Sequence, residues 1–179
     1  MRTYIRDKTK GGTYFLTVNL ANRKSKLLTK HINEFRHAYQ LTKQNHDFEL
    51  HAMILLPDHI HMLITLAETS DNYAVIIASI KTHFSRRIKK SASETISQSR
   101  IRSRERGIWQ RRFWEHRIRD ELDYRRHMDY IHYNAVKHGY VNSPVDWPYS
   151  TFQKCVEDGF YSSDWGGVGI NGIEIDHDE

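Results

Sequence analysis

The segment from residue 55 to residue 66, LLPDHIHMLITL, constrains the fold of this chain more than any other stretch. The residues on both sides of Pro57 are typical of strands, and Pro57 and Asp58 predict a tight turn between them. Because successive strand residues point to opposite faces, His59 and His61 are predicted to share one face while Ile60 takes the other. The segment therefore indicates a hairpin that presents two imidazoles on one rigid surface.

Around this hairpin, the hydrophobic periodicity predicts the elements of an α+β domain. Strands are expected over Thr13–Leu20, Phe48–Leu56, His59–Leu66 and Ile108–Arg119, and helices over Thr29–Asn45, Asp71–Lys90 and Asp120–His138. The order β-α-β-β-α-β, followed by a helix, predicts a ferredoxin-like four-stranded antiparallel sheet with an additional C-terminal helix that carries tyrosines. Thr29 is expected to cap the first helix. The Ser- and Arg-rich residues 91–106 are expected to form a mobile basic loop.

Charge is distributed unevenly along the chain. Residues 81–119 contain thirteen Lys and Arg against three acids, whereas the residues after Lys154 contain seven acids and no Lys or Arg. A basic body with an acidic end favours a polyanionic partner, most simply nucleic acid. The cations expected to contact it are Arg2, Arg6, Lys8, Lys10, Arg23, Lys24, Lys81, Arg86, Arg87, Lys89, Arg111, Arg112, Arg117 and Arg119.

These patterns predict one catalytic domain over residues 1–155 and an acidic tail over residues 156–179. Within the tail, the aromatic residues of 157–167 favour docking on the domain, whereas 168–179 is expected to compete with nucleic acid for the basic face. No apolar run approaches the length of a membrane span, and the basic N-terminus lacks the apolar centre of a signal peptide. The single Cys155 excludes an internal disulfide and a cysteine zinc site. A cytoplasmic protein with no membrane partner is expected.

The helix predicted over Asp120–His138 contains three tyrosines with different expected surroundings. Spacings of four, three and four residues predict a buried stripe of Tyr124, Met128, Ile131 and Ala135. Tyr130 and Asn134 lie one turn apart on the flank of this stripe, so both can point into one site at the sheet edge. Tyr133 is predicted to be exposed, where it can stack on a base.

The two histidines, the tyrosine and the amide together suggest phosphodiester chemistry. A divalent cation, Mg²⁺ or Mn²⁺, held by His59, His61 and the Asn134 oxygen can polarise a phosphate oxygen. The Tyr130 hydroxyl can then attack the phosphorus and form a covalent phosphotyrosine. A free phenol has a pKa near 10 and is a weak nucleophile, so the cation must assist it. The sequence shows no evident general base.

Two other functions agree with part of the pattern. A sequence-specific nucleic-acid-binding protein with structural histidines explains the charge, but not the spacing of Tyr130 and Asn134. A phosphodiesterase that uses water as its nucleophile needs further Asp or His ligands, and apart from Asp58 of the predicted turn none lies near the two histidines in the sequence. A covalent protein–DNA adduct, free cleaved ends or neither would distinguish the three functions.

Several motifs resemble one known family. LPDHIHMLITL is similar to the HUH motif (His-hydrophobic-His) of the single-tyrosine transposases, and DYIHYNAVKHG to their tyrosine helix. Four motifs, GGTYFLTVNLANRKSKLL, IWQRRFWEHRIR, HMDYIHYNAVKHGYV and DWPYSTF, follow one another in this order along the chain. Together they resemble the REP-associated tyrosine transposases, and the resemblance runs from about residue 4 to residue 165. The family often has Pro after the Asn, where this chain has Ala135, and residues 91–106 look like an insertion.

The resemblance implies a transposase-like DNA endonuclease and strand transferase of bacteria, associated with the nucleoid. It implies that Tyr130 is the nucleophile, that His59 and His61 bind the metal, and that Asn134 stands for the Gln or Asn one turn after the tyrosine. The implied substrate is a single-stranded REP hairpin with a tetranucleotide at its foot, cleaved and rejoined through a 5′-phosphotyrosine. The N-terminal cations are expected to read that foot. A monomer and a homodimer both agree with the family pattern.

Overall fold

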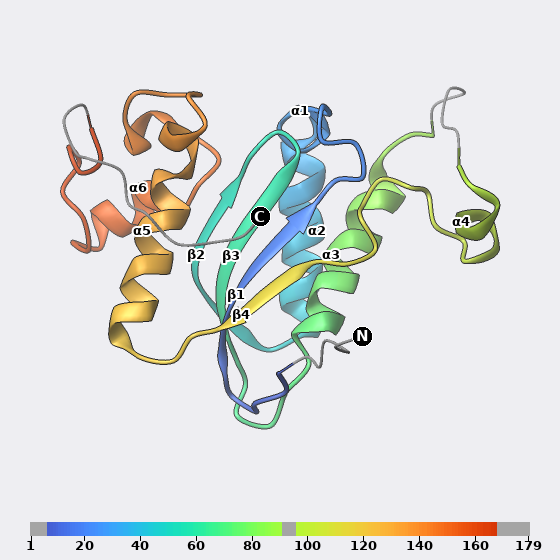
Figure 1. The fold of residues 1–179 in the computed structure, drawn as a ribbon, viewed down its shortest axis with the longest axis horizontal. Helices are drawn as coiled ribbons and strands as arrows, with labels where there is room; N and C mark the ends of the chain where they lie inside the picture. Colours follow the sequence, from blue (N-terminus) through green and yellow to red (C-terminus); the bar gives the residue numbers. More distant parts are fainter. Residues whose placement is uncertain (1–6, 91–95, 168–179) are drawn as a thin grey trace, which may run out of the picture.

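Figure 1 shows the computed structural model of the chain, which describes residues 7–90 and 96–167. Four strands form one sheet in the order β2-β3-β1-β4, and every neighbouring pair is antiparallel. The strands are β1 (Thr13–Asn19), β2 (Phe48–Leu55), β3 (His59–Leu66) and β4 (Trp114–Arg117). The predicted fold class is therefore confirmed.

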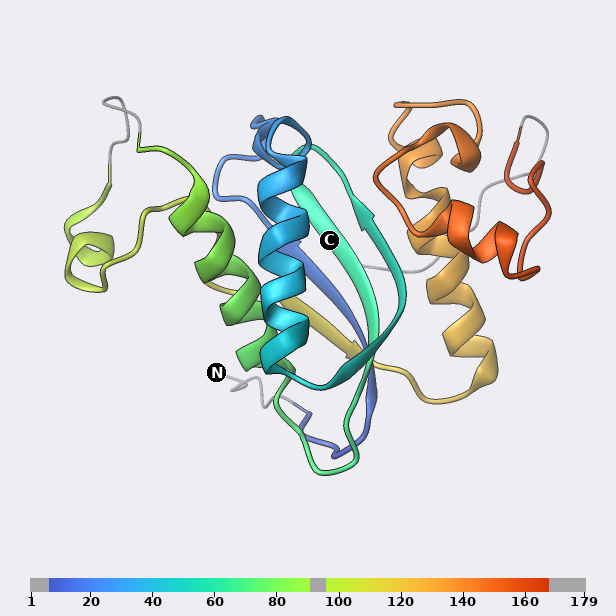
Figure 2. The same ribbon diagram turned by 180° about the vertical axis from the view of Figure 1, so that it is seen from behind.

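The helices are α1 (Leu27–Lys30), α2 (Ile32–Asn45), α3 (Tyr73–Arg87), α4 (Gln98–Arg102), α5 (Glu121–Lys137), η1 (Pro144–Asp146) and α6 (Phe152–Glu157). The long helices lie on the two faces of this sheet, α2 and α3 on one and α5 on the other, whereas α4 lies to the side, beyond α3 (Figures 1 and 2). On one face, α2 and α3 bury the β1 and β3 residues whose side chains alternate with the histidines, such as Leu16 and Met62. On the other face, α5 packs with Phe15 and Leu63. The sheet therefore separates two hydrophobic cores.

The helix predicted over Thr29–Asn45 is two helices, because the backbone leaves the helical conformation at His31 (φ −118°, ψ 44°). The predicted cap at Thr29 is wrong, since Thr29 lies inside α1 and its hydroxyl donates to the Lys26 carbonyl. The fully buried Leu28 anchors α1 to the turn of the hairpin, where its N–H donates to the Pro57 carbonyl at 3.2 Å. The contact between Leu28 and the hairpin turn therefore decides where α1 begins.

The basic loop predicted over residues 91–106 contains the short helix α4, and residues 91–95 lie outside the described residues. The Arg106 guanidinium donates to the carbonyls of Ser85 and Ile88 at the end of α3. The prediction of a loop is therefore wrong for residues 98–102, which form α4, and Arg106 ties the following residues to α3 by pairing carbonyls that a helix end leaves without partners.

Helix α5 begins at its N-cap Asp120, whose side chain accepts from the Asp123 N–H at 2.9 Å. Met128, Ile131 and Ala135 of the predicted stripe are buried. Tyr124 was predicted to be buried with them, but it is only half-buried and packs at the margin of the core. Tyr133 is also half-buried rather than exposed, because its ring contacts Trp165 with centroids 6.5 Å apart.

Residues after α6 pack back on the domain as far as they are described. The Tyr161 hydroxyl donates to Asp129 on α5 at 2.7 Å, and its ring contacts Trp165 at 4.7 Å. Phe160 does not take part, because it is 74% exposed. The division at residue 155 stays a prediction, and the inhibitory segment expected at 168–179 lies outside the described residues. Among the residues that the structure describes, no helix is long and apolar enough to cross a membrane.

Candidate active site

Strand β3 places both histidines of the motif on the face that α5 covers. His61 lies opposite Thr17 of β1, and His59 lies opposite Asn19 at the end of the same pair. Their ring centroids are 4.9 Å apart, and both residues are buried, His59 with 3% and His61 with 1% of its surface exposed. The alternation predicted from the sequence therefore describes the observed placement, because the strand pairing continues without a bulge through this part of β1 and β3.

Each histidine is oriented by a second residue that the sequence analysis missed. His59 Nδ1 donates to Asp58 Oδ1 at 2.8 Å, and Asp58 also pairs with Arg23 at 3.0 Å. His61 Nδ1 is hydrogen-bonded to the Thr17 hydroxyl at 2.9 Å. With both Nδ1 atoms engaged by the protein, Nε2 is the atom that each ring can offer to a cation, an arrangement that fixes the ring of a metal ligand. Asp58 directly precedes His59, so adjacency was a usable signal, whereas Thr17 is 44 residues from His61.

The protonation state of His59 suits metal binding. Burial lowers the pKa of His59 below its ordinary value of 6.5, and this effect outweighs the opposing contribution of the Asp58 hydrogen bond. Neutral imidazole is the form that binds metals, so this site favours the ligand form at neutral pH.

Helix α5 lies opposite the two histidines with three residues spaced four apart. The Tyr130 ring is 5.3 Å from the His61 ring, and the His138 ring, just beyond the end of the helix, is 5.4 Å from the His59 ring. Asn134 is four residues from each and therefore lies between them on the same flank. The structure thus brings Tyr130 and Asn134 together with the histidines, and adds His138, which the sequence analysis had not considered for this site.

The Asn134 side chain indicates that something further binds here. The residue is fully buried, and neither its amide oxygen nor its amide nitrogen has a hydrogen-bond partner among the described residues. Leaving a polar group buried without a partner costs about 1–3 kcal/mol, so such groups have a reason to be present. An amide oxygen beside two imidazoles is a donor set that Mn²⁺ or Mg²⁺ accepts. The residues therefore fit the expected divalent cation.

Tyr130 is held in a largely apolar setting. It is 2% exposed, and its ring packs edge-on against Phe15 at 5.8 Å. The Lys137 ammonium lies 4.8 Å from the centre of the same ring. Lys137 follows Tyr130 by seven residues, a spacing that repeats on one helix face, so the sequence contained a signal for this contact that was not used.

A second group of polar residues anchors the start of α5 to β4. His116 Nε2 donates to Asp123 Oδ2 at 2.8 Å, and the ring of His127 stacks on that of His116 at 4.7 Å. His127 in turn contacts Phe15, which also packs on Tyr130. Burial raises the pKa of Asp123, but hydrogen bonds from His116 and the Arg119 N–H outweigh it and leave the pKa below 3.8. These residues set where α5, and with it Tyr130, meets the sheet.

Replacing Asp123 by Ala is expected to destabilise the fold by about 1–3 kcal/mol, because the bonds to His116 and to the Arg119 N–H are both lost. The lowered pKa means that this stability is present above the ordinary pKa and is lost as pH falls through the folded value. Urea unfolding at pH 7 measures the loss. Glu121→Ala, which removes an exposed acid from the same first turn, is the control and should change the free energy of unfolding by less than about 0.5 kcal/mol. Equal losses would contradict the anchoring role.

The cations expected to bind DNA lie in several places. Arg2 and Arg6 lie outside the described residues, and Lys8, Lys10, Lys24, Arg87, Lys89 and Arg119 are exposed. Arg23 pairs with Asp58 beside the histidines, whereas Arg117 pairs with Asp7 at 3.0 Å. Lys81, Arg86 and Arg111 line a large cavity, and Arg112 lines a smaller one. The structure therefore separates one expected basic surface into a part near the histidines and a hollow beside α3.

Known proteins resemble this chain over most of its length. Residues 10–134 match the family described as "Transposase IS200 like". A REP-associated tyrosine transposase of Haemophilus influenzae is 52% identical over 167 residues, which are 93% of this chain and 94% of that protein. One from Escherichia coli is 42% identical over 93% of this chain and 92% of that protein. A solved structure of a REP-associated tyrosine transposase bound to a REP hairpin covers 96% of this chain and 95% of that chain, with 41% identity and a TM-score of 0.79.

Proposed function

Because the chain belongs to the IS200-like transposase family, and within it to the REP-associated tyrosine transposases, we propose a function in DNA strand transfer. In this proposal, the protein cleaves and rejoins single-stranded DNA at REP hairpins through Tyr130. One observation carries the proposal. Tyr130 lies against His61, and one turn further along the same flank Asn134 is buried with no hydrogen-bond partner for its side chain among the described residues. A protein that only binds DNA has no need for a phenol in this position.

In the proposed reaction, the Tyr130 oxygen attacks the scissile phosphorus. The new bond joins the tyrosine oxygen to the 5′-phosphate, the bond from phosphorus to O3′ breaks, and O3′ takes its electron pair and a proton. The product is a 5′-phosphotyrosine with a free 3′-hydroxyl, and rejoining is the same step in reverse. The apolar contacts of the Tyr130 ring limit its rotation, so the hydroxyl is held in one direction before DNA binds.

We propose that His59 Nε2, His61 Nε2 and the Asn134 oxygen hold a divalent cation, Mg²⁺ or Mn²⁺. When bound, it supplies Lewis-acid polarisation of the phosphate and stabilises the negative charge of the transition state. The chain's own part is to orient these ligands, which Asp58 and Thr17 do through the Nδ1 atoms, while burial favours the neutral form of His59. Arg23, paired with Asp58 at the surface end of this arrangement, is placed to contact an incoming phosphate.

The direct test is incubation of the protein with a labelled single-stranded hairpin and Mg²⁺ or Mn²⁺, followed by denaturing electrophoresis. The proposal expects a labelled band that remains attached to the protein and disappears after protease treatment. Free cleaved ends without an adduct would instead support a water-using phosphodiesterase. Binding without either product, at saturating metal and DNA, would support the alternative of a non-catalytic nucleic-acid-binding protein with structural histidines.

The basic surface predicts strongly salt-dependent hairpin binding. Each phosphate neutralised by Lys or Arg on a single strand steepens the fall of log K against log salt by about 0.7. A footprint that uses six of the expected cations should therefore give a slope near −4, roughly the sum of six such contributions. Fluorescence anisotropy of a labelled hairpin between 50 and 300 mM salt, roughly the range over which such slopes are resolved, measures it. A flat response would exclude the expected cations from the DNA contact.

A further inference from the structure

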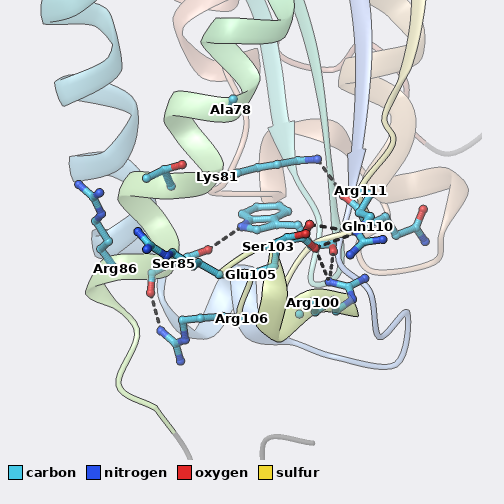
Figure 3. Close-up of a pocket in the computed structure, with 14 residues that line it drawn as sticks. Ala78, Lys81, Ser85, Arg86, Arg100, Ser103, Glu105, Arg106, Gln110 and Arg111 are labelled. Carbon is cyan, nitrogen blue, oxygen red and sulfur yellow. Dashed lines mark hydrogen bonds and ion pairs between the residues drawn. The ribbon is translucent and has the colours of Figure 1, made fainter. Parts of the chain in front are cut away.

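A cavity of about 600 Å³ lies between α3 and the segment that follows α4 (Figure 3). One wall is the C-terminal half of α3, and the other is the chain from Arg100 to Arg111. Among the described residues, its lining contains one carboxylate, Glu105, against six cations: Lys81, Arg86, Arg100, Arg104, Arg106 and Arg111. A hollow with five positive charges in excess is an anion-binding environment.

The cavity is built by contacts that tie the segment to α3 before any ligand arrives. The Trp109 indole N–H donates to the Ser85 hydroxyl at 3.1 Å, and Lys81 Nζ donates to the Gln110 carbonyl at 2.9 Å. Arg106 donates to the carbonyls at the end of α3, as described above. Figure 3 shows Lys81 extending from α3 toward Gln110 on the opposite wall. The walls are therefore preorganised, which lowers the entropic cost of binding.

The cations of the cavity do not all have the same role. Glu105 accepts two bonds of 3.0 Å from Arg111 and lies 3.6 Å from Arg100, so this carboxylate already pairs with cations of the same wall. Arg86 and Arg104 have no acidic partner among the described residues, and both are exposed. Arg104 has a left-handed backbone (φ 55°), which a non-glycine residue adopts rarely. The guanidinium groups of Arg86 and Arg104 therefore take part in no ion pair among the described residues and can contact an anionic ligand.

A smaller cavity of about 320 Å³ lies between this hollow and the β1–β3 end that carries His59. It shares Gln110 with the large cavity and is lined by Asn19, which pairs with His59. The Gln110 N–H donates to the Asn19 carbonyl at 2.9 Å, so the step from His59 to Gln110 spans about two strand spacings, roughly 10 Å.

The smaller cavity also contains residues from both faces of the sheet. Trp114 lies opposite Thr17 on the histidine face, whereas the Glu115 side chain lies on the other face, within 3.2 Å of Tyr73. Trp114 is 39% exposed and offers a surface on which a base can stack. A strand that leaves the histidines can therefore pass around the β4 edge of the sheet toward the six cations.

We propose that the cavity between α3 and the Arg100–Arg111 segment binds the phosphates of the single-stranded DNA that flanks the hairpin. The flank runs from the catalytic residues across Asn19 and Gln110, and it ends on the charges that Arg86 and Arg104 supply. This inference rests on the proposed function for the identity of the strand. The cavity thus raises the affinity for hairpins that carry a single-stranded flank. Because it contacts phosphates, it does so without base specificity.

The test compares two double variants in a Tyr130→Phe background, so that binding is measured without cleavage. Arg86→Gln with Arg104→Gln removes the two unused charges of the cavity. The control, Lys90→Gln with Arg102→Gln, removes two exposed charges from just beyond α3 and from the end of α4, and neither residue lines the cavity. Anisotropy is measured with a bare hairpin and with hairpins that carry a single-stranded flank on the 5′ or the 3′ side.

The cavity variant should lose roughly 10- to 30-fold in affinity for at least one flanked hairpin at 0.1 M salt, and its salt slope should fall by about 1.4, twice the contribution of one phosphate. Its affinity for the bare hairpin should be unchanged, and the control variant should lose less than about threefold on every substrate, because isolated exposed charges are screened. Equal losses in both variants, or the same loss on the bare hairpin, would overturn the proposal.

A separate arm distinguishes a strand from a small anion. Inorganic phosphate and a mononucleotide are titrated against the wild-type protein, with thermal unfolding as the readout. Stabilisation by these anions that the cavity variant loses, with no dependence on a flank, would assign the cavity to a small ligand and overturn the strand proposal. If the wild-type protein forms no covalent adduct, the proposed function fails, but the comparison of flanked and bare hairpins still decides the use of the cavity.

Discussion

Replacing Tyr130 by Phe is expected to abolish cleavage and adduct formation while hairpin affinity stays within about twofold of the wild-type value. Only the hydroxyl is lost, and the ring keeps its contacts with Phe15 and His61. Because no nucleophile remains, the cleavage rate should fall on the order of 10⁴-fold or more, as happens when other covalent nucleophiles are removed. Denaturing electrophoresis with labelled hairpin measures the rate and the adduct together.

The matched control is Tyr133→Phe, which changes a tyrosine of the same helix. Tyr133 contacts Trp165 rather than the histidines, so its hydroxyl has no part in the proposed reaction. This variant should cleave at close to the wild-type rate. Normal cleavage by Tyr130→Phe, or loss of the adduct in Tyr133→Phe alone, would show that the nucleophile has been assigned to the wrong tyrosine.

The second large effect is expected for the histidines. His59→Ala and His61→Ala should each weaken Mn²⁺ binding by more than about 100-fold, and each should remove metal-dependent cleavage. The β1–β3 pairing runs through main-chain atoms and should survive, so the loss in the free energy of unfolding should stay within about 1–3 kcal/mol. Calorimetry with Mn²⁺ measures affinity, and thermal unfolding measures the fold.

His51→Ala is the matched control, because His51 lies on neighbouring β2, is half-buried and contacts Tyr124 instead of the candidate ligands. Thr17→Val tests orientation alone: it removes the hydrogen bond to His61 Nδ1 and should weaken Mn²⁺ binding about 10- to 100-fold while sparing the ligand itself. Unchanged Mn²⁺ affinity in both His59→Ala and His61→Ala would leave these residues a structural role only.

The sequence by itself determined the hairpin, the common face of the two histidines and the order of the elements. Alternation along a strand and periodicity along a helix are local properties, and they decide which residues share a face before any packing occurs. The same reasoning related Tyr130 to Asn134, because one turn of helix separates them. The N-cap at Asp120, which was predicted only as the first residue of the last helix, follows from equally local rules.

Where local rules failed, a partner distant in sequence had decided the structure. Thr29 has the side chain of an N-cap, but burial of Leu28 against the hairpin turn moved the start of the helix to Leu27. Arg106 was predicted to belong to a polar loop, but its guanidinium donates to the carbonyls of Ser85 and Ile88 at the end of α3, about 20 residues earlier. Tyr133 was predicted to be exposed, but Trp165 covers it.

Only the tertiary structure decided which helix faces the histidines and how closely. The sequence placed Tyr130 and Asn134 on one flank but contained no measure of where α5 crosses β3, which depends on the His116–Asp123–His127 anchor. It also gave no sign that Thr17 would orient His61, or that Gln110 would line both the cavity beside α3 and the smaller cavity that Asn19 lines. The physical reason is that side-chain direction follows from backbone periodicity, whereas contact between elements follows from the packing of surfaces that are dozens of residues apart.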